Sequence, residues 1–129
     1  MSKIIVQTDK APAAIGPYSQ GVIASCGQMV FISGQIPLIP ESMELITGNI
    51  KEQTERVMQN LEGALNAAGC SFDEVVRTTI FLKDMNDFAA VNDVYATRFT
   101  QNPPARACVE VSRLPKDVDV EIDCIAVKA

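Results

Sequence analysis

The stretch PARACVEVSRLPKDVDVEIDCIAV, residues 104–127, predicts two β-strands joined by a short connection. Small and β-branched residues dominate its two halves, at about 106–111 and 118–127, and such residues favour strands. The segment SRLPKD between the halves contains a proline, which cannot donate to a strand ladder. Arg106 stands at the head of the first strand among small neighbours, and its purpose is the first question that the sequence raises.

Arg106 has two interpretations at this stage. Because side chains alternate along a strand, Arg106 shares a face with Cys108 and Glu110. Glu110 lies about 13 Å along the strand from Arg106, too far for a direct ion pair. The planar guanidinium is suited to bind a carboxylate through two parallel hydrogen bonds. The alternative is a solvated arginine, or one in a weak surface ion pair.

The second strand carries acids at alternate positions. Asp119, Glu121 and Asp123 share one face, and apolar side chains occupy the other. Such a pattern is typical of a strand with one exposed face. If Glu121 lies beside Arg106 on a neighbouring strand, its carboxylate can accept a proton from water or orient the water. Both interpretations stay open.

The rest of the chain predicts two helices and four more strands. Asn49 with Glu52 resembles a capping box, and apolar residues then recur on one helical face until Gly69. A second helix is predicted over about 86–99, with Asn86 as its cap. Strands are predicted at 3–8, 21–25, 28–37 and 75–82.

This order predicts an α+β fold, with a six-stranded, mostly antiparallel sheet and two helices on one face. The length of 129 residues predicts a single domain over 1–129. The runs MVFI (29–32) and TTIFL (78–82) carry apolar side chains on both faces of their strands. The sheet face without helices therefore needs another protein surface, and we expect a homo-oligomer.

Composition narrows the function classes. The formal net charge is −5, which argues against a nucleic-acid or membrane surface. The chain has no histidine and four widely spaced cysteines, so a zinc site would need all the cysteines or help from carboxylates. We expect Cys70 and Cys124 to be buried thiols. We also expect no targeting or membrane segment, hence a soluble protein of a reducing compartment, the cytoplasm.

Five other residues are candidates for a site. Tyr18 sits in a Pro- and Gly-rich loop, and Ser33 closes a strand. Gly34 permits either close approach of a ligand to the backbone or a β-bulge. Asn92 is a polar residue on the apolar face of its helix, or a partly exposed one. Cys108 is a small core residue or a weak polar group beside a ligand; without histidine we expect no covalent catalysis.

Four segments together resemble the RidA family, also called YjgF/YER057c/UK114. They are APAAIGPYSQG (11–21), FISGQIP (31–37), NDFAAVNDVY (86–95) and the stretch 104–127, and the likeness runs from residue 3 to 128. The resemblance implies a chorismate-mutase-like fold assembled as a homotrimer with three clefts between subunits. It also implies hydrolysis of reactive enamines and imines, such as 2-aminoacrylate, to 2-keto acids and ammonia.

The resemblance also implies roles for individual residues. Arg106 matches the arginine that binds the substrate carboxylate, and Glu121 matches the acid that orients or activates water. We expect Glu121 beside Arg106 to stay ionised. The reaction implies no metal or cofactor, because an imine is already electrophilic. The residues matching the lining of the cleft are Tyr18, Ser33, Gly34, Asn92 and Cys108.

Three positions depart from the family pattern. Met43 stands where the family usually has a glycine, and methionine tolerates a positive φ poorly, so we expect this loop to take another shape. Ala107 replaces a common serine, and Asn49 replaces a common aspartate. None of these changes removes a matched cleft residue.

Two other classes of function remain. A trimeric protein that binds small carboxylates such as 2-keto acids, with little turnover, would use Arg106 equally well. A ribonuclease or translation inhibitor is also attached to family members, but the acidic composition and the lack of histidine weigh against it. The sequence does not address a chaperone role.

Overall fold

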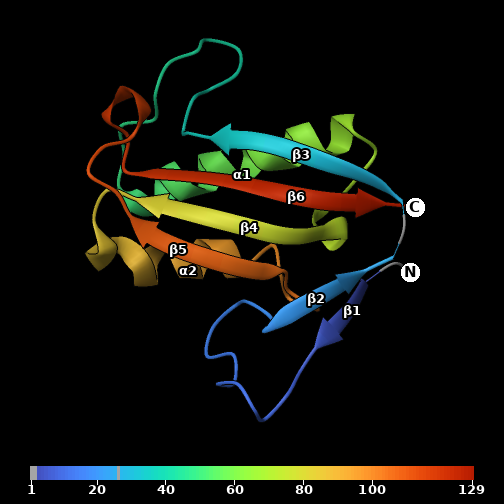
Figure 1. The fold of residues 1–129 in the computed structure, drawn as a ribbon. Helices are drawn as coiled ribbons and strands as arrows, with labels where there is room; N and C mark the ends of the chain where they lie inside the picture. The colour runs from blue at the N-terminus through green and yellow to red at the C-terminus, as the bar shows by residue number, and fades with distance from the viewer. Residues whose placement is uncertain (1–2, 26) are drawn as a thin grey trace.

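The computed structural model describes residues 3–25 and 27–129, and these follow the predicted order of strands and helices (Figure 1). Three short 3₁₀ turns, η1 to η3, occupy connections between them. The elements are β1 (Lys3–Val6), β2 (Gly21–Ala24), β3 (Gln28–Gln35), α1 (Ile50–Ala67), η1 (Phe72–Glu74), β4 (Val75–Leu82), η2 (Met85–Asp87), α2 (Phe88–Ala96), β5 (Ala105–Glu110), η3 (Pro115–Asp117) and β6 (Val120–Lys128).

The α+β class is confirmed, but a single six-stranded sheet is wrong. Four strands form one sheet in the order β3-β6-β4-β5, and β1 pairs only with β2. The β1–β2 hairpin is held instead near the start of β5 by Ser19 of its connecting loop. Ser19 N donates to Pro104 O at 3.1 Å, and Ser19 Oγ donates to Pro103 O. β4 and β5 run parallel because α2 crosses between them, and the other pairs are antiparallel.

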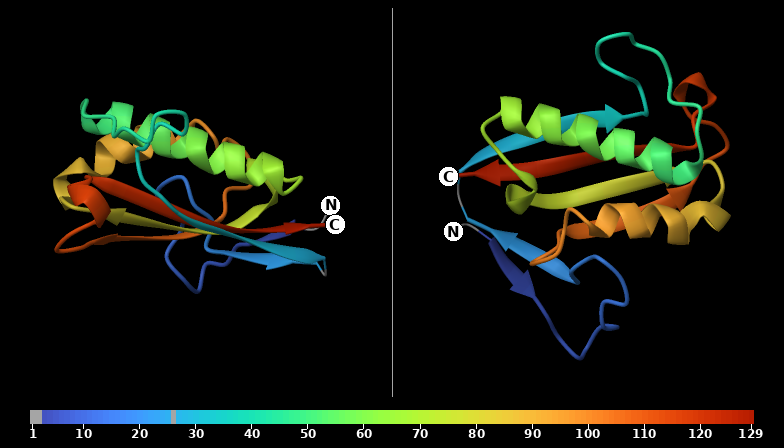
Figure 2. Two further views of the ribbon diagram at one scale, coloured as in Figure 1. Left: turned by 90° about the horizontal axis from the view of Figure 1, so that it is seen from above. Right: turned by 180° about the vertical axis from the view of Figure 1, so that it is seen from behind.

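Both helices lie on one face of the four-stranded sheet, as predicted (Figure 2). The core forms there, between the helices and alternate residues of β4 and β6. The predicted capping box begins α1: Glu52 N donates to Asn49 Oδ1 at 2.9 Å, and Asn49 N donates to Glu52 Oε1 at 3.4 Å. Gly69 follows α1 with φ of 79°, the left-handed conformation expected of it.

The opposite face of the sheet carries exposed apolar side chains, as predicted. Met29 and Phe31 of β3 are 59% and 68% exposed, and Val109 of β5 is also exposed. An exposed apolar surface of this kind is typical of a face that another protein surface covers.

Two local predictions are wrong. Asp84 caps the 3₁₀ turn η2 that leads into α2: its Oδ1 accepts from Asn86 N at 2.9 Å. Asn86 therefore donates to a cap instead of acting as one, and α2 itself follows Asp87 without a side-chain cap. Met43 adopts φ of 60° and is 65% exposed, so the loop keeps the left-handed backbone that we expected methionine to prevent. Met43 N donates to Ile39 O at 2.7 Å, which holds this turn closed. The turn is retained at a cost in backbone strain.

Candidate active site

Arg106 lies on the helix-covered face of the sheet, beneath α2. In the parallel pairing of β4 and β5 it stands opposite Thr78, whose side chain is buried on that face. Its Nη1 donates to Asn92 Oδ1 at 2.6 Å. The Asn92 side chain is thus engaged by Arg106, and its role is to hold the guanidinium as well as to line the site.

Three aromatic rings surround the guanidinium. Arg106 Cζ lies 5.1 Å from the ring centroid of Tyr95 and 5.5 Å from those of Phe88 and Tyr18. The faces of aromatic rings carry partial negative charge and attract a cation at these distances. The rings stabilise the positive charge of Arg106 without neutralising it.

The helix α2 supplies three of these four contacts. Phe88, Asn92 and Tyr95 are spaced at i, i+4 and i+7, so they lie along one stripe of the helix. Tyr95 is fully buried, and Phe88 packs against the edge of the core. The sequence did not predict Phe88 and Tyr95 as walls around Arg106; their shared spacing with Asn92 was the signal that could have found them.

Arg106 has no carboxylate partner among residues 3–25 and 27–129. The ion pairs of this part of the chain join Lys51 with Asp93, Arg98 with Glu55, and Arg113 with Asp117. A guanidinium has five N–H donors, and the one described side-chain acceptor is Asn92. A half-buried, unpaired arginine between aromatic rings has the chemistry to bind an anion, and its planar fork matches a carboxylate.

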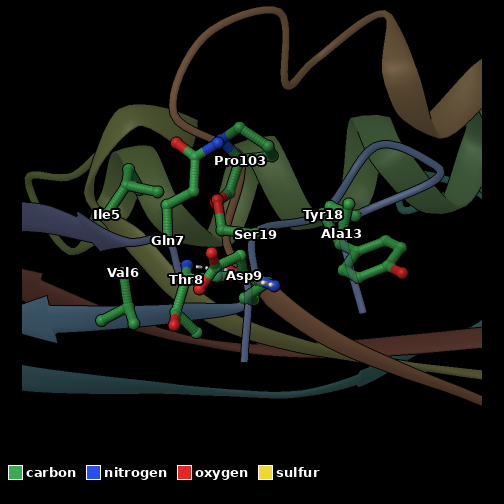
Figure 3. Close-up of a pocket in the computed structure, with 11 residues that line it drawn as sticks. Ile5, Val6, Gln7, Thr8, Asp9, Ala13, Tyr18, Ser19 and Pro103 are labelled. Atoms are coloured by element: carbon green, nitrogen blue, oxygen red, sulfur yellow. Dashed lines mark hydrogen bonds between the residues drawn. The ribbon is translucent and has the colours of Figure 1, made fainter. Parts of the chain in front are cut away.

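Tyr18 reaches Arg106 from the loop before β2. A Cβ atom added at Gly16 would lie 3.6 Å from the Tyr18 ring and 3.7 Å from Arg106 Nη2, so this turn runs close to both groups. A cavity of about 500 Å³ adjoins Tyr18, with Ile5 and Val6 of β1 on its other side (Figure 3). Arg106 is not in its lining.

Cys108 lies two residues from Arg106 on the same face and is half-buried. Burial raises the pKa of its thiol, and the charge of Arg106 offsets part of that rise. The group is therefore a protonated thiol at neutral pH, which suits a small polar contact better than a nucleophile. Cys70 and Cys124 are buried free thiols, as predicted, and Cys26 lies outside the described residues.

A second cluster of predicted site residues surrounds Glu121. A Cβ atom at Gly34 would overlap the Glu121 carboxylate, so the carboxylate occupies the space that the glycine leaves open. Ser33 and Gly34 lie at an irregularity in the pairing of β3 with β6, between Ile32 and Gln35. The absence of a side chain at Gly34 thus allows the Glu121 carboxylate to lie against the backbone of β3.

The two clusters lie on opposite faces of the sheet, so one chain does not place Glu121 beside Arg106, an arrangement that the sequence left open. Arg106 pairs with Thr78 and Glu121 pairs with Phe81, three residues further along β4. An odd separation places side chains on opposite faces of a strand. Arg106 therefore groups with Tyr18, Asn92 and Cys108, and Glu121 with Ser33 and Gly34.

The separation also changes the expected ionisation of Glu121. Burial raises the pKa of its carboxyl, and the negative charge of Asp123 on the same face raises it further. Arg106 does not contribute to this shift in the single chain, so the lowering of the pKa expected from a neighbouring Arg106 is not present there.

The sequence matches the model of the endoribonuclease L-PSP family over residues 8–128. It is 55% identical to the protein DfrA of Myxococcus xanthus, over 98% of this chain and 97% of that protein. It is 48% identical to the 2-iminobutanoate/2-iminopropanoate deaminase of Escherichia coli, over 99% of each chain. The chain belongs to the RidA family.

Solved structures of RidA-family proteins share the fold. A crystal structure titled as a putative endoribonuclease from Thermotoga maritima has a TM-score of 0.78 at 50% identity, with 98% of each chain covered. E. coli TdcF with bound serine has a TM-score of 0.75 at 42% identity, covering 98% of this chain and 99% of that one. The names within this RidA group include both deaminase and endoribonuclease, so family membership leaves the activity to be argued from the site.

Within the described part of this RidA-family chain, no three or more cysteine or carboxylate side chains gather where a metal ion would fit. None of the described helices is long and apolar enough to cross a membrane.

Proposed function

We propose that the protein hydrolyses reactive 2-enamine and 2-imino acids, such as 2-aminoacrylate, to 2-keto acids and ammonia. The observation that carries the proposal is the guanidinium of Arg106, which is held by Asn92 and three aromatic rings and has no carboxylate partner in the described chain. Relatives about 48% identical that are named 2-iminobutanoate/2-iminopropanoate deaminase support this substrate class.

The proposed chemistry divides between Arg106 and Glu121. An enamine first takes a proton on carbon to give the imine, whose C2 is electrophilic without any metal or cofactor. Water adds its oxygen to C2 as the C=N π bond breaks, and the proton that Glu121 takes from the water passes on to the nitrogen. The remaining hydroxyl proton follows to the nitrogen, the C–N bond breaks, and ammonia leaves with the carbonyl formed. Arg106 binds the carboxylate, with about 1.5–3 kcal/mol for each charged hydrogen bond. Glu121 orients the water and accepts its proton, which contributes about 10²- to 10⁴-fold.

We further propose that the site forms between copies of the chain in a homotrimer, in the cytoplasm, with residues 1–129 acting as one domain. One chain places Arg106 and Glu121 on opposite faces, so a single substrate meets both only if they come from two chains. Exposed Met29 and Phe31, on the face that carries Glu121, supply apolar area for such contacts.

The direct test measures how much imine escapes to semicarbazide when an L-amino-acid oxidase generates it. We expect the wild type to divert the imine to keto acid, and the folded Arg106→Ala and Glu121→Ala proteins to fail. A wild type that is inert toward several imino acids would overturn the proposal.

A second candidate is a trimeric protein that binds small carboxylates with little turnover. The unpaired Arg106 favours it equally, and the structure of TdcF with bound serine gives a relative occupied by a small carboxylate. Calorimetry with 2-ketobutyrate separates the candidates: binding without deaminase activity favours the second. An endoribonuclease function, as in the family description, has less support because the net charge is −5 and the chain lacks histidine.

A further inference from the structure

A buried hydroxyl pair lies behind the Arg106 site. The hydroxyl of Tyr95 is 2.7 Å from Thr78 Oγ1, and the two residues are 0% and 1% exposed. Phenylalanine and valine would fill nearly the same volume without needing a hydrogen bond. Buried polar pairs of this kind fix one arrangement of the groups around them, because any other arrangement leaves a hydroxyl unsatisfied.

The pair is placed where it can fix Arg106. Thr78 stands opposite Arg106 across the β4·β5 ladder. Tyr95 presents the nearest of the three rings to the guanidinium, at 5.1 Å. Asn92, one turn earlier on α2, accepts the hydrogen bond from Arg106. The Tyr95–Thr78 bond thus ties the helix that holds Arg106 to the strand next to it.

We propose that Tyr95, fixed by its hydrogen bond with Thr78, is a positioning residue that sets the guanidinium plane of Arg106 for carboxylate binding. This inference rests on the proposed function, because it assumes that Arg106 binds the substrate carboxylate. A long arginine side chain loses considerable rotamer freedom when it is ordered, and a prearranged guanidinium avoids that loss during binding.

The ionisation of Tyr95 agrees with this role. Burial raises the pKa of its hydroxyl to about 12, although the bond with Thr78 and the charge of Arg106 each lower it. The hydroxyl therefore stays protonated over the working range of pH. It supplies no anion to compete with a carboxylate for Arg106.

The test compares four single variants and one double variant. Tyr95→Phe keeps the ring and removes the bond, Thr78→Val removes the partner, and Thr78→Ser keeps a hydroxyl. Thr54→Val is the matched control: Thr54 is also fully buried, and its Oγ1 donates to Ile50 O at 2.7 Å within α1. We measure the Kd for 2-ketobutyrate by calorimetry, and KM and kcat with enzymatically generated imine.

We expect Tyr95→Phe and Thr78→Val to raise Kd and KM by about 3- to 10-fold with kcat nearly unchanged. Thr78→Ser should restore both constants. Thr54→Val should lower Tm and leave Kd and KM unchanged. The double variant Thr78→Val/Tyr95→Phe should bind no more weakly than the weaker single variant, because both substitutions remove one interaction. Unchanged Kd and KM in both single variants, or equal changes in Thr54→Val, would overturn the proposal.

A measurement without substrate separates this inference from the proposed function. The Nε–H resonance of Arg106 in the NMR spectrum of the free protein reports how firmly the guanidinium is held. We expect one sharp resonance in the wild type and in Thr78→Ser, and a broadened or shifted one in Tyr95→Phe. If the wild type neither hydrolyses imines nor binds keto acids, the proposed function fails, while an unaltered resonance in Tyr95→Phe refutes the positioning role independently.

Discussion

The two clusters of site residues differ in what completes them. Around Arg106 the chain supplies the supports itself: the Asn92 oxygen, which accepts a hydrogen bond from Arg106, and three rings, two of them from α2. Around Glu121 the chain provides the open space at Gly34 and the negative charge of Asp123. The Arg106 cluster is therefore organised before any partner binds. The Glu121 cluster lies on the sheet face without helices, and among the described residues no cation pairs with its carboxylate.

The largest expected effect is on the Arg106 cluster. Arg106→Lys keeps the positive charge but loses the planar fork, so we expect kcat/KM to fall by about 100-fold or more. Most of the loss should appear in KM, because the interaction holds the carboxylate before and during the reaction. Steady-state kinetics with a 2-imino acid checks this, and a KM within twofold of the wild type would show that charge alone suffices.

The second largest expected effect is on the Glu121 cluster. Gly34→Ala places a methyl group where the Glu121 carboxylate lies, so the carboxylate must move. We expect kcat to fall by about 10- to 100-fold with KM little changed, since the acid–base step is affected and carboxylate binding is not.

Gly63→Ala is the matched control for that substitution. Gly63 lies in α1, and a Cβ atom there would meet nothing within 4 Å. We expect this variant to keep full activity and to gain about 0.5–1 kcal/mol in the free energy of unfolding. Equal kcat losses in the two alanine variants would contradict the seating role of Gly34.

A pH-dependent prediction concerns Glu121 in the Arg106→Ala background. In that background burial and Asp123 raise the pKa of Glu121 above its ordinary value of 4.5, so the folded state favours the neutral carboxyl. The contribution of Glu121 to the free energy of unfolding is therefore fully present below pH 4.5 and is lost as the pH rises through the folded-state pKa. Adding Glu121→Gln should raise Tm by about 1–3 °C above that pKa and change nothing below 4.5.

With Arg106 present, the gain in Tm from Glu121→Gln should shrink or become a loss. If Arg106 of the partner subunit lies beside Glu121, it favours the carboxylate and opposes the rise in pKa. Thermal unfolding of Glu121→Gln in both backgrounds, between pH 4 and pH 8, measures the difference. An identical gain with and without Arg106 would contradict a shared site.

The smallest effect lies outside both clusters. Met43 holds a left-handed backbone in an exposed loop, so Met43→Gly should relieve strain and raise the free energy of unfolding by about 0.5–1 kcal/mol, net of the greater entropy of the unfolded glycine. Denaturant unfolding tests the gain, and activity should not change. A loss of stability would show that the methionine side chain makes contacts that outweigh the strain.

The sequence predicted local features better than long-range register. Alternation in 104–111 correctly placed Arg106 with Cys108 on one face, and the Asn49–Glu52 pattern correctly placed the start of α1. Whether Arg106 and Glu121 share a face of the sheet depends on how β5 and β6 each pair with β4. No local sequence pattern predicts these two registers. The separate β1–β2 hairpin depends likewise on distant bonds, those of Ser19 with Pro103 and Pro104.

The central claim is that Arg106 and Glu121 of different chains form one site. The most direct measurement co-expresses Arg106→Ala and Glu121→Ala chains with different tags, isolates mixed oligomers and measures imine hydrolysis. In each mixed trimer one of the three sites, about a third, should combine an intact Arg106 with an intact Glu121. We therefore expect mixed trimers from two inactive parents to give about a third of wild-type activity, and Arg106→Ala mixed with the double variant to give none. Mixed oligomers no more active than their parents would contradict the shared site.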